Sequence, residues 1–390
     1  MEKKKVAYIY DPAFNTFDYG SEHPMKPQRI GMTHELIESY QLLPKLQVYK
    51  SPSMEINELL EFHDEKYLQF LQKVNPENEE QFSKEMEIYN PEEDCPIFKG
   101  LFEYSCLQAG SSKLGAKLLN DKEVEIAINW SGGYHHARKS QASGFCFVND
   151  IVLAIQELLK HHTRVLYIDI DIHHGDGVET AFFSSNRVMT CSFHKYEDDW
   201  WPYTGKVSRI GTGKGENYSV NVPLKDNIDD EQYIYIFKKT MKEVIDRFQP
   251  NAIVMQCGCD TLAGDIIGDF NLTLEGPAEC VRFIRQYNLP LLVLGGGGYT
   301  PKNVARCWTY LTSLLIDGKK LEKELPENID RDIYGPNNLL YIDKYNRENK
   351  NSFEELDNIY TEIHNHLKNI EIVTSVENLI VSTKKQLKIK

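Results

Sequence analysis

The sequence has no apolar run that approaches the roughly 18 residues needed for a membrane-spanning helix. Its first residues, Met1 to Lys5, are mostly charged and lead directly into a strand-like run. They therefore lack the apolar stretch and the cleavage site of a secretion signal. These absences exclude a membrane protein and predict a soluble protein of the nucleus or the cytoplasm.

Paired cysteines are also lacking, because the eight cysteines lie far apart except for Cys257 and Cys259. That pair has no second pair at the spacing of a zinc knuckle. Cys191 and Cys257 lie within apolar, strand-like runs, which is typical of reduced and buried thiols. The pattern argues against a disulfide framework and for an intracellular protein.

An excess of positive charge is lacking as well, since the formal net charge is −14. Such a chain does not neutralise phosphates, so we expect no direct, sequence-specific binding of DNA. An acidic surface suits a basic partner, such as a lysine-rich peptide. Solubility alone is the simpler explanation of the charge, so a basic partner needs further support.

Internal repeats are absent, and no linker interrupts the chain before about residue 330. Strand-like runs alternate instead with helical patterns, which predicts an α/β domain with a mostly parallel, multi-stranded sheet flanked by helices on both faces. The predicted strands are 6–10, 124–130, 164–170, 187–193, 252–256 and 290–294, and the predicted helices are 33–40, 55–62, 100–119, 150–160, 230–247 and 303–315.

The chain divides by composition into one domain, residues 1–345, and a polar tail, residues 346–390. Residues 75–94 are acidic and contain proline, so we predict an irregular surface segment there. The tail has a helical pattern over 352–367 and a basic end, which we expect to be mobile.

The chemistry of the chain centres on the stretch from Asp169 to Gly177, which follows the apolar run Val165 to Ile168. If that strand continues, Asp169, Asp171 and His173 share one of its faces. A buried carboxylate without a partner costs several kcal/mol. The stretch therefore predicts a metal site at the carboxyl edge of a parallel sheet.

Four polar clusters fall just beyond predicted strand ends, where the ligand crevice of an open parallel sheet lies. They are His135-His136, Asp169 to Asp176, Cys259-Asp260 and Gly298-Tyr299. Asp171, His173 and Asp260 offer two carboxylates and one imidazole, which suits zinc with an open fourth position. The same donor set also suits ferrous iron, and ligand type alone does not choose between the two metals.

The histidine pair suits proton transfer better than metal binding, because neighbouring loop residues rarely bind one ion together. His135 and His136 would need orienting carboxylates, and Asp169 and Asp176 are available for this role. The Tyr299 hydroxyl, after four glycines, can donate to a developing oxyanion. We predict no function for the remaining histidine pairs, His161-His162 and His364 with His366, which we expect to be solvated.

These motifs together resemble the class I zinc-dependent histone deacetylases. The similar segments, in the order of that family, are His23 to Pro27, Gly132 to Ala137, Ser143 to Cys146, Tyr167 to Val178, Gln256 to Gly258 with Asp260, and Gly295 to Thr300. The resemblance runs from about residue 5 to about residue 345, so residues 1–345 would be a catalytic domain with the arginase/deacetylase-like fold.

The resemblance implies a role for each matching residue. Zinc would bind Asp171, His173 and Asp260. His136 would be general base and then general acid, with His135 electrostatic, Asp169 and Asp176 supporting the two histidines, and Tyr299 donating to the substrate carbonyl. The tube for the acyl-lysine chain would be lined by Gly144, Phe145, Trp201 and, at the rim, Ile267 and Asp94. Arg29 would lie by an internal channel, and a structural potassium ion would bind near Asp169, Asp171, His173, Ser192 and Phe193.

The implied function is removal of acetyl groups from N6-acetyl-lysine in histones and other proteins, in chromatin-linked transcriptional repression. Acetylated histone tails and corepressor proteins would be partners, and the location would be the nucleus, with the cytoplasm in addition. Lys26 and Lys302 match inositol-phosphate-binding residues of close nuclear relatives. Ile266 stands where an arginine is expected, which puts inositol phosphate binding in doubt.

Three positions depart from the family and concern the tube. Trp201 stands for a phenylalanine and would narrow or reshape the tube, Tyr134 stands for leucine or tryptophan and would alter the inner pocket below the tube, and Tyr203 stands for a glycine. Because tyrosine lacks the access of glycine to positive φ, we expect the loop at Tyr203 to differ.

Two other functions stay open at this point. An enzyme of the same fold could hydrolyse acetylpolyamines or other small amides, although no insertion that would block the rim is evident. A catalytically silent scaffold that binds acetylated peptides is the second alternative, and the complete set of ligands, histidines and tyrosine argues against it.

Overall fold

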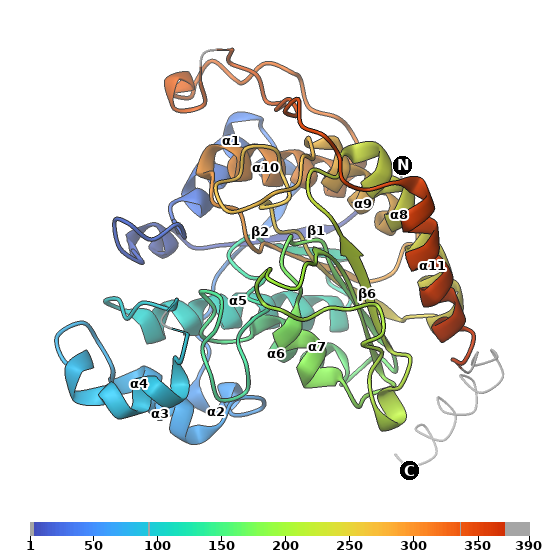
Figure 1. Cartoon of the computed structure of the whole chain (residues 1–390). Coiled ribbons are helices and arrows are strands. Elements are labelled where there is room, and N and C mark those ends of the chain that lie inside the picture. Colours follow the sequence, from blue (N-terminus) through green and yellow to red (C-terminus); the bar gives the residue numbers. More distant parts are fainter. Residues whose placement is uncertain (1–3, 93, 336, 371–390) are drawn as a thin grey trace, which may run out of the picture.

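The computed structural model describes residues 4–92, 94–335 and 337–370 (Figure 1). Within these residues eight strands form one sheet in the order β2-β1-β3-β8-β7-β4-β5-β6, and all neighbouring strands run parallel. The strands are β1 Val6–Tyr10, β2 Gln47–Lys50, β3 Ile126–Asn129, β4 Val165–Asp169, β5 Val188–Lys195, β6 Ser219–Leu224, β7 Ala252–Gln256 and β8 Leu291–Leu294. The predicted α/β class with a parallel sheet is confirmed.

Helices cover both faces of this sheet, with α5, α6 and α7 on one side and α1, α8, α9 and α10 on the other (Figure 1). The α-helices are α1 Arg29–Ser39, α2 Ile56–Leu59, α3 Glu65–Lys73, α4 Ser83–Tyr89, α5 Leu101–Asn120, α6 Asp150–Leu158, α7 Asp176–Phe182, α8 Asp230–Phe248, α9 Glu275–Arg285, α10 Pro301–Asp317 and α11 Phe353–Leu367. Short 3-10 helices are η1 Pro12–Thr16, η2 Leu43–Lys45, η3 Glu79–Phe82, η4 Gly213–Gly215 and η5 Arg331–Ile333.

Strand β4 shows why helices must cover both faces of the sheet. Val165 and Tyr167 join the core on the side of α6, whereas Leu166 and Ile168 join the core on the opposite side. All four side chains are buried. A strand buried on both faces reads as a continuous apolar run, as expected for a parallel sheet between two helix layers.

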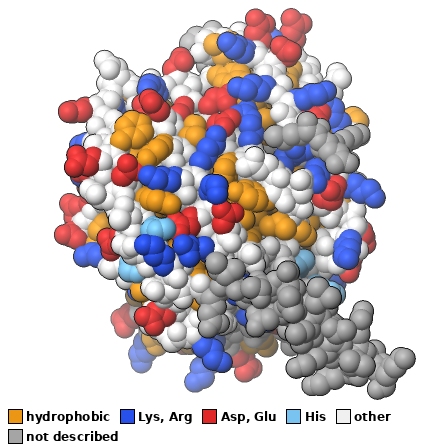
Figure 2. All heavy atoms as spheres, turned by 90° about the vertical axis from the view of Figure 1, so that its right-hand side faces the viewer, with side chains coloured by type: hydrophobic (Ala, Val, Ile, Leu, Met, Phe, Trp, Pro, Cys, Tyr) orange, Lys and Arg blue, Asp and Glu red, His pale blue; other side chains and the backbone are white. Residues whose placement is uncertain are grey.

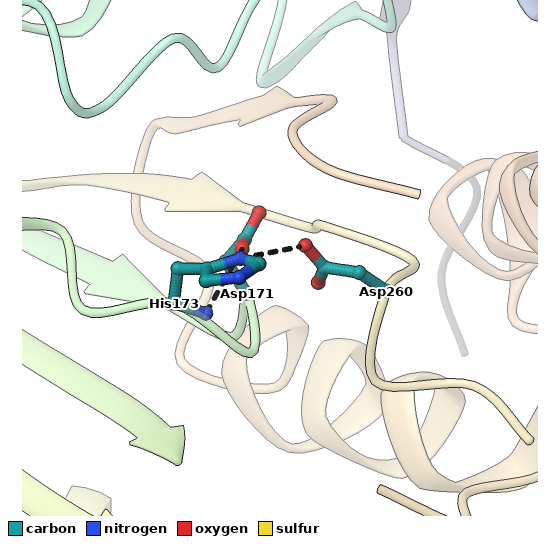
Figure 3. Close-up of side chains that lie close together, drawn as sticks. All are labelled: Asp171, His173 and Asp260. Atoms are coloured by element: carbon teal, nitrogen blue, oxygen red, sulfur yellow. Dashed lines mark hydrogen bonds and ion pairs between the residues drawn. The ribbon is translucent and has the colours of Figure 1, made fainter. Parts of the chain in front are cut away.

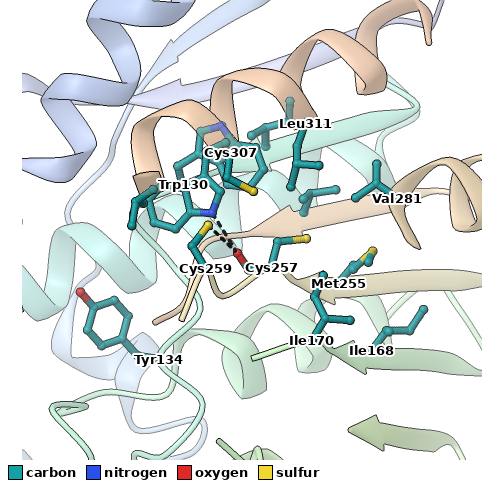
Figure 4. Packing of buried hydrophobic residues seen from close by; sticks show 14 of the residues in the cluster. Trp130, Tyr134, Ile168, Ile170, Met255, Cys257, Cys259, Val281, Cys307 and Leu311 are labelled. Atoms are coloured by element: carbon teal, nitrogen blue, oxygen red, sulfur yellow. Dashed lines mark hydrogen bonds between the residues drawn. The ribbon is translucent and has the colours of Figure 1, made fainter. Parts of the chain in front are cut away.

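The core beneath the carboxyl edge contains several thiols. Cys257, Cys259 and Cys307 pack near Trp130 (Figure 4). All eight cysteines are free and buried, in agreement with the expectation of reduced thiols. Among the described residues, no helix has both the length and the apolar character needed to span a membrane.

Several elements differ from the sequence expectation. Residues 75–94 are not irregular throughout, because η3 and α4 lie inside this segment. The edge strands β2 and β6 were not predicted: β2 is polar and largely exposed, and β6 contains Pro223. Proline is tolerated only at an edge, where its missing N–H interrupts no ladder. Helices α3, α7 and α9 were not predicted either.

The central four strands end at the same level of the sheet. Asp169 is the register partner of Gln256, Gln256 of Leu294, and Leu294 of Asn129. These are the last residues of β4, β7, β8 and β3. The loops that carry the four polar clusters therefore leave one edge side by side.

Helix α11 packs along α8, as Figure 1 shows. His364 Nδ1 lies 2.6 Å from Glu243 Oε1, so this histidine is not merely solvated as we expected. His162 Nε2 is buried as well. The division at residue 345 stays a prediction, and the expected mobile basic end lies outside the described residues.

Candidate active site

Asp171, His173 and Asp260 converge beyond the ends of β4 and β7 (Figure 3). Each offers a ligand atom within 4.8 Å of those of the others, and all three residues are buried. His173 Nδ1 lies 3.3 Å from Asp171 Oδ1 and 3.2 Å from Asp260 Oδ2. The arrangement is compatible with a metal ion, as the donor types predicted.

The expected shared strand face is not what unites these residues. Strand β4 ends at Asp169, so Asp171 and His173 lie in the loop that follows. Asp171 Oδ2 accepts hydrogen bonds from Gln256 Nε2 at 2.7 Å and from the Gly297 N–H at 2.8 Å. The end of β7 and the glycine-rich loop after β8 thus orient the Asp171 carboxylate, which we had expected a longer β4 to position.

Glycine is required beside these carboxylates. A Cβ on Gly297 would lie 2.0 Å from Asp260 Oδ2, and one on Gly258 would lie 2.1 Å from Asp171 Oδ2. Because real Cβ atoms do not approach so closely, larger residues there would push the carboxylates apart. The glycine-rich ends of β7 and β8 therefore belong to the site.

Two histidine–carboxylate pairs lie beside the metal donors. His135 Nδ1 is 2.7 Å from Asp169 Oδ2, and His136 Nδ1 is 2.7 Å from Asp176 Oδ1. Both histidines are buried, with ring centroids 3.9 Å apart. The Asp150 carboxylate holds the preceding turn by accepting from the N–H groups of Gly133 and Tyr134, each at 2.9 Å.

Burial and neighbouring charges separate the protonation of the two histidines. Burial lowers the pKa of His135, but the Asp169 and Asp171 carboxylates outweigh it and raise the pKa to about 9. Burial and the His135 charge lower the pKa of His136 to about 3. Burial and the Asp171 carboxylate raise the pKa of Asp260. Two buried carboxylates without a cation repel each other, which is the condition that a metal relieves.

Tyr299 completes the floor of the site. Its backbone N–H donates to Asp265 Oδ2 at 2.7 Å, and its ring contacts Phe145 edge-on, with centroids 5.7 Å apart. Arg29 secures the glycine loop before it by donating to the carbonyls of Gly296 and Gly298 at 2.6 and 2.7 Å. The buried Arg29 guanidinium thus holds the glycine-rich loop that carries Tyr299.

A cavity of about 500 Å³ leads down to these groups. All five predicted tube residues line it, together with His136, His173 and Tyr299; the five are Asp94, Gly144, Phe145, Trp201 and Ile267. Glu92 and Tyr203 also line it. Tyr203 was expected to alter this region, whereas the sequence predicted no role for Glu92. In the sequence, nothing distinguishes Glu92 from the other acidic residues of this surface segment, so its place in the cavity could not be predicted.

The comparisons with known proteins agree with this geometry. A family described as "Histone deacetylase domain" matches residues 23–315. Human histone deacetylase 1 is 51% identical over 366 residues, which cover 94% of this chain and 76% of the relative. Type-1 histone deacetylase 1 of Dictyostelium discoideum is 50% identical over 370 residues, which cover 95% of this chain and 74% of the relative. The chain belongs to the class I histone deacetylase family. It is therefore an enzyme of the hydrolase class.

Within this deacetylase domain, the loop that follows β5 carries two of the three departures noted above, Trp201 and Tyr203. Tyr203 does adopt positive φ, at +64°, contrary to our expectation that tyrosine would exclude this conformation. Its N–H donates to the Trp200 carbonyl at 2.9 Å, and its side chain is 62% exposed. The hydrogen-bonded turn therefore overrides the preference of tyrosine for negative φ. The Tyr203 ring is exposed to solvent at the mouth of the cavity.

Trp201 forms one wall of the deacetylase cavity. Its ring stands edge-on to His136, with centroids 4.4 Å apart, and its Nε1 donates to Glu92 Oε2 at 3.3 Å. A Cβ on Gly144 would lie 2.3 Å from the Trp201 ring. Gly144 therefore allows the larger aromatic side chain to fit beside the histidine.

A second, inner cavity lies beyond the floor and has a volume of only about 10 Å³. Tyr134 lines it, and its hydroxyl is hydrogen-bonded to the Tyr104 hydroxyl. The change of the inner pocket that Tyr134 predicts stays a prediction.

The two lysines considered for inositol phosphate lie apart from the cavity lining. Lys26 Nζ donates to the carbonyls of Gly20 and Ser21 at 2.9 and 2.8 Å. Lys302 is exposed in the first turn of α10. These contacts do not test inositol phosphate binding, which Ile266 puts in doubt.

Proposed function

We propose that the chain is a zinc-dependent hydrolase that removes acetyl groups from N6-acetyl-lysine in histones and other proteins. The observation that carries the proposal is a buried cluster of metal donors beside two histidine–aspartate pairs, at the foot of a narrow cavity. The enzyme would act in the nucleus in chromatin-linked repression, with corepressor proteins as partners.

The donor residues fit a catalytic zinc ion. Asp171, His173 and Asp260 provide two carboxylates and one imidazole, and three protein ligands leave a position open for substrate or water. The same set fits ferrous iron, so the choice of zinc rests on the family resemblance. When bound, the metal would activate a water molecule and polarise the amide carbonyl. A structural potassium ion near Asp169 and Ser192 belongs to the same proposal.

The chain itself supplies proton transfer. His136 has its Nδ1 hydrogen-bonded to Asp176, so its Nε2 is the nitrogen that remains to take the proton of the attacking water. The same nitrogen then returns the proton to the leaving lysine amine. Asp176 orients the ring, because its other oxygen accepts from Arg138 at 2.7 Å.

The remaining groups stabilise charge and hold the substrate. The Tyr299 hydroxyl donates to the developing oxyanion, and His135, held by Asp169, contributes electrostatically. Gly144, Phe145 and Trp201 enclose the methylene chain of the lysine. Asp94 has its Oδ2 occupied by the Gly144 N–H at 2.8 Å, whereas its buried Oδ1 has no partner among the described residues. The Asp94 carboxylate lines the cavity and would accept a backbone N–H of a substrate peptide.

The test is turnover of an acetyl-lysine peptide beside acetylspermidine, with and without a metal chelator. We expect hydrolysis of the peptide, loss of activity with chelator, and recovery when zinc is restored. Turnover of acetylspermidine alone would instead support the polyamine hydrolase. Binding of the peptide without turnover, insensitive to chelator, would support the scaffold.

Two substitutions test the assigned roles. Tyr299→Phe and His136→Ala should each lower kcat by about 100-fold or more while the protein still folds and binds zinc. His161→Ala is the matched control, because His161 is exposed and lies outside the cavity lining. Near-normal turnover by zinc-loaded Tyr299→Phe would contradict the role of the hydroxyl.

A further inference from the structure

The imidazole of His173 lacks the contact that usually orients a metal-binding histidine. Its Nδ1 faces the Asp171 and Asp260 oxygens. Ligating histidines normally donate their other ring N–H to a carboxylate or a carbonyl. Among the described residues, no hydrogen-bond partner holds His173 Nε2. Another interaction must therefore fix the plane of this ring.

Trp200 supplies a flat surface against that plane. The ring centroids of His173 and Trp200 are 5.7 Å apart, and the two planes differ by only 8°. This is an offset stack, the arrangement that aromatic rings prefer over direct overlap. The neighbouring Trp201 meets His173 edge-on at 70°, so the two tryptophans constrain different directions of ring movement.

Trp200 is itself held by a buried cation. Lys195 Nζ lies 3.7 Å from the centroid of the Trp200 ring. Two carboxylates fix the ammonium group, Asp226 Oδ1 at 2.6 Å and Asp269 Oδ2 at 2.7 Å. The lysine is 4% exposed, so its attraction to the ring is little weakened by water.

The backbone of the same lysine is also hydrogen-bonded to the loop after β4, which carries Asp171 and His173. Its N–H donates to the carbonyl of Ile172, the residue before His173, at 2.8 Å. Lys195 is the last residue of β5, so it is anchored in the sheet. One residue thus holds both the loop beneath His173 and the ring that stacks on it.

We propose that Trp200 is a positioning residue for the metal-binding histidine, and that Lys195 fixes Trp200 in place. Trp200 is not among the residues that line the cavity, so it acts through His173 rather than through the substrate. The proposal rests on the proposed function only in requiring that the cluster of Asp171, His173 and Asp260 binds zinc. Its consequence is a preorganised imidazole and therefore tighter binding of the metal.

The test measures zinc affinity by competition with a chromophoric chelator, independently of turnover. Trp200→Leu should weaken zinc binding by about 10- to 100-fold, the usual effect of removing a partner that orients a ligand. Trp200→Phe keeps a ring for stacking and should restore most of that loss. Lys195→Met should weaken binding by about 2- to 30-fold, the range of a cation–π contact.

A matched control removes a cation from the same carboxylate without touching Trp200. Lys350 also pairs with Asp226 and is exposed, so Lys350→Met should bind zinc like the unmodified protein. Wild-type zinc affinity in both Trp200→Leu and Lys195→Met would overturn the proposal. Equal losses in the leucine and phenylalanine variants would also overturn it, because stacking would then not be the cause.

The outcomes separate this inference from the function. If the unmodified protein turns over acetyl-lysine peptide and Trp200→Leu binds zinc normally, only the positioning role fails. If the unmodified protein binds zinc without turnover and Trp200→Leu binds it more weakly, only the proposed reaction fails. Thermal unfolding of the metal-free variants identifies any variant that does not fold. The variants that do fold then decide whether Trp200 positions His173.

Discussion

Tyr134 shows how one side chain can limit the size of the acyl group that the site accepts. It lines the inner cavity, whose volume of about 10 Å³ is no more than one water molecule needs. Its hydroxyl is engaged by Tyr104, and both rings are buried. We therefore expect the space beyond the reacting carbonyl to accommodate an acetyl group better than a longer acyl chain.

We predict that Tyr134→Leu raises turnover of propionyl-lysine peptide relative to acetyl-lysine peptide by about tenfold, because a pocket discriminates by about that factor for each methylene group. The measurement is the ratio of kcat/KM for the two peptides. Tyr104→Phe is the control, since it removes the same hydrogen bond without opening the cavity. An unchanged ratio in Tyr134→Leu would show that another residue limits the acyl chain.

At the scale of elements, the buried His63 holds the loop after β3, which carries His135 and His136, against α6. His63 lies at 2% exposure, with its Nδ1 3.1 Å from the Lys139 carbonyl. Its Nε2 accepts the Asn149 backbone N–H at 3.0 Å, so the ring is neutral in the folded protein. Asn149 caps α6 and donates to the Ala137 carbonyl at 2.8 Å. The histidine thus connects α6 to the loop that carries His135 and His136.

This anchor predicts a pH dependence of stability. Burial lowers the pKa of His63 to about 4, against about 6.5 in the unfolded chain. The unfolded state therefore binds the proton first, and the free energy of unfolding falls as the pH drops from about 6.5 to about 4. The contribution of this one group is about 3 kcal/mol over that range.

The measurement is the melting temperature of the protein and of His63→Gln at several pH values across this window. Glutamine keeps one donor and one acceptor but does not titrate, so its melting temperature should fall less steeply. Groups common to both proteins cancel in the comparison. Parallel curves for the two proteins would mean that His63 does not gain a proton on unfolding.

The whole molecule is acidic, but its charge is not spread evenly. Figure 2 shows the face that carries α8 and α11, where Lys and Arg side chains are interspersed with Asp and Glu. Ion pairs such as Lys239–Asp357, at 2.5 Å, cross between these two helices. The mouth of the active-site cavity differs, because Glu92 and Asp94 line it and no lysine or arginine is among its described lining residues.

We predict that peptides with lysine or arginine beside the acetyl-lysine have a KM about two- to fivefold lower than neutral peptides, the range for exposed charge pairs. The preference should shrink as salt is raised from 0.01 M toward 1 M, because the screening length falls from about 30 to about 3 Å. Glu92→Gln should reduce the preference, whereas Glu87→Gln, on exposed α4, should not. A preference that does not respond to salt would point to shape rather than charge.

The central strands and the chemistry of the site were predictable from local sequence. Strands β1, β4, β7 and β8 are short apolar runs that end in polar or glycine-rich motifs, and both features are visible without a fold. Asp171, His173 and Asp260 could be grouped because carboxylates and an imidazole after apolar strands are costly to bury without a cation. The edge strands escaped prediction, because β2 is short, polar and largely exposed, and because β6, although almost fully buried, contains Pro223, which argues against a strand.

Other parts of the site depend on distances that only the folded chain defines. The sequence by itself determined the donor atoms, the histidine–carboxylate pairs as candidates, and the parallel sheet whose edge collects them. Tertiary structure decided which oxygen faces which nitrogen, that Glu92 meets Trp201, and that Lys195 lies over Trp200 beside His173. The physical reason is that periodicity and residue type report burial and chemistry, whereas ring stacking and ion pairing depend on how separate loops pack at one sheet edge.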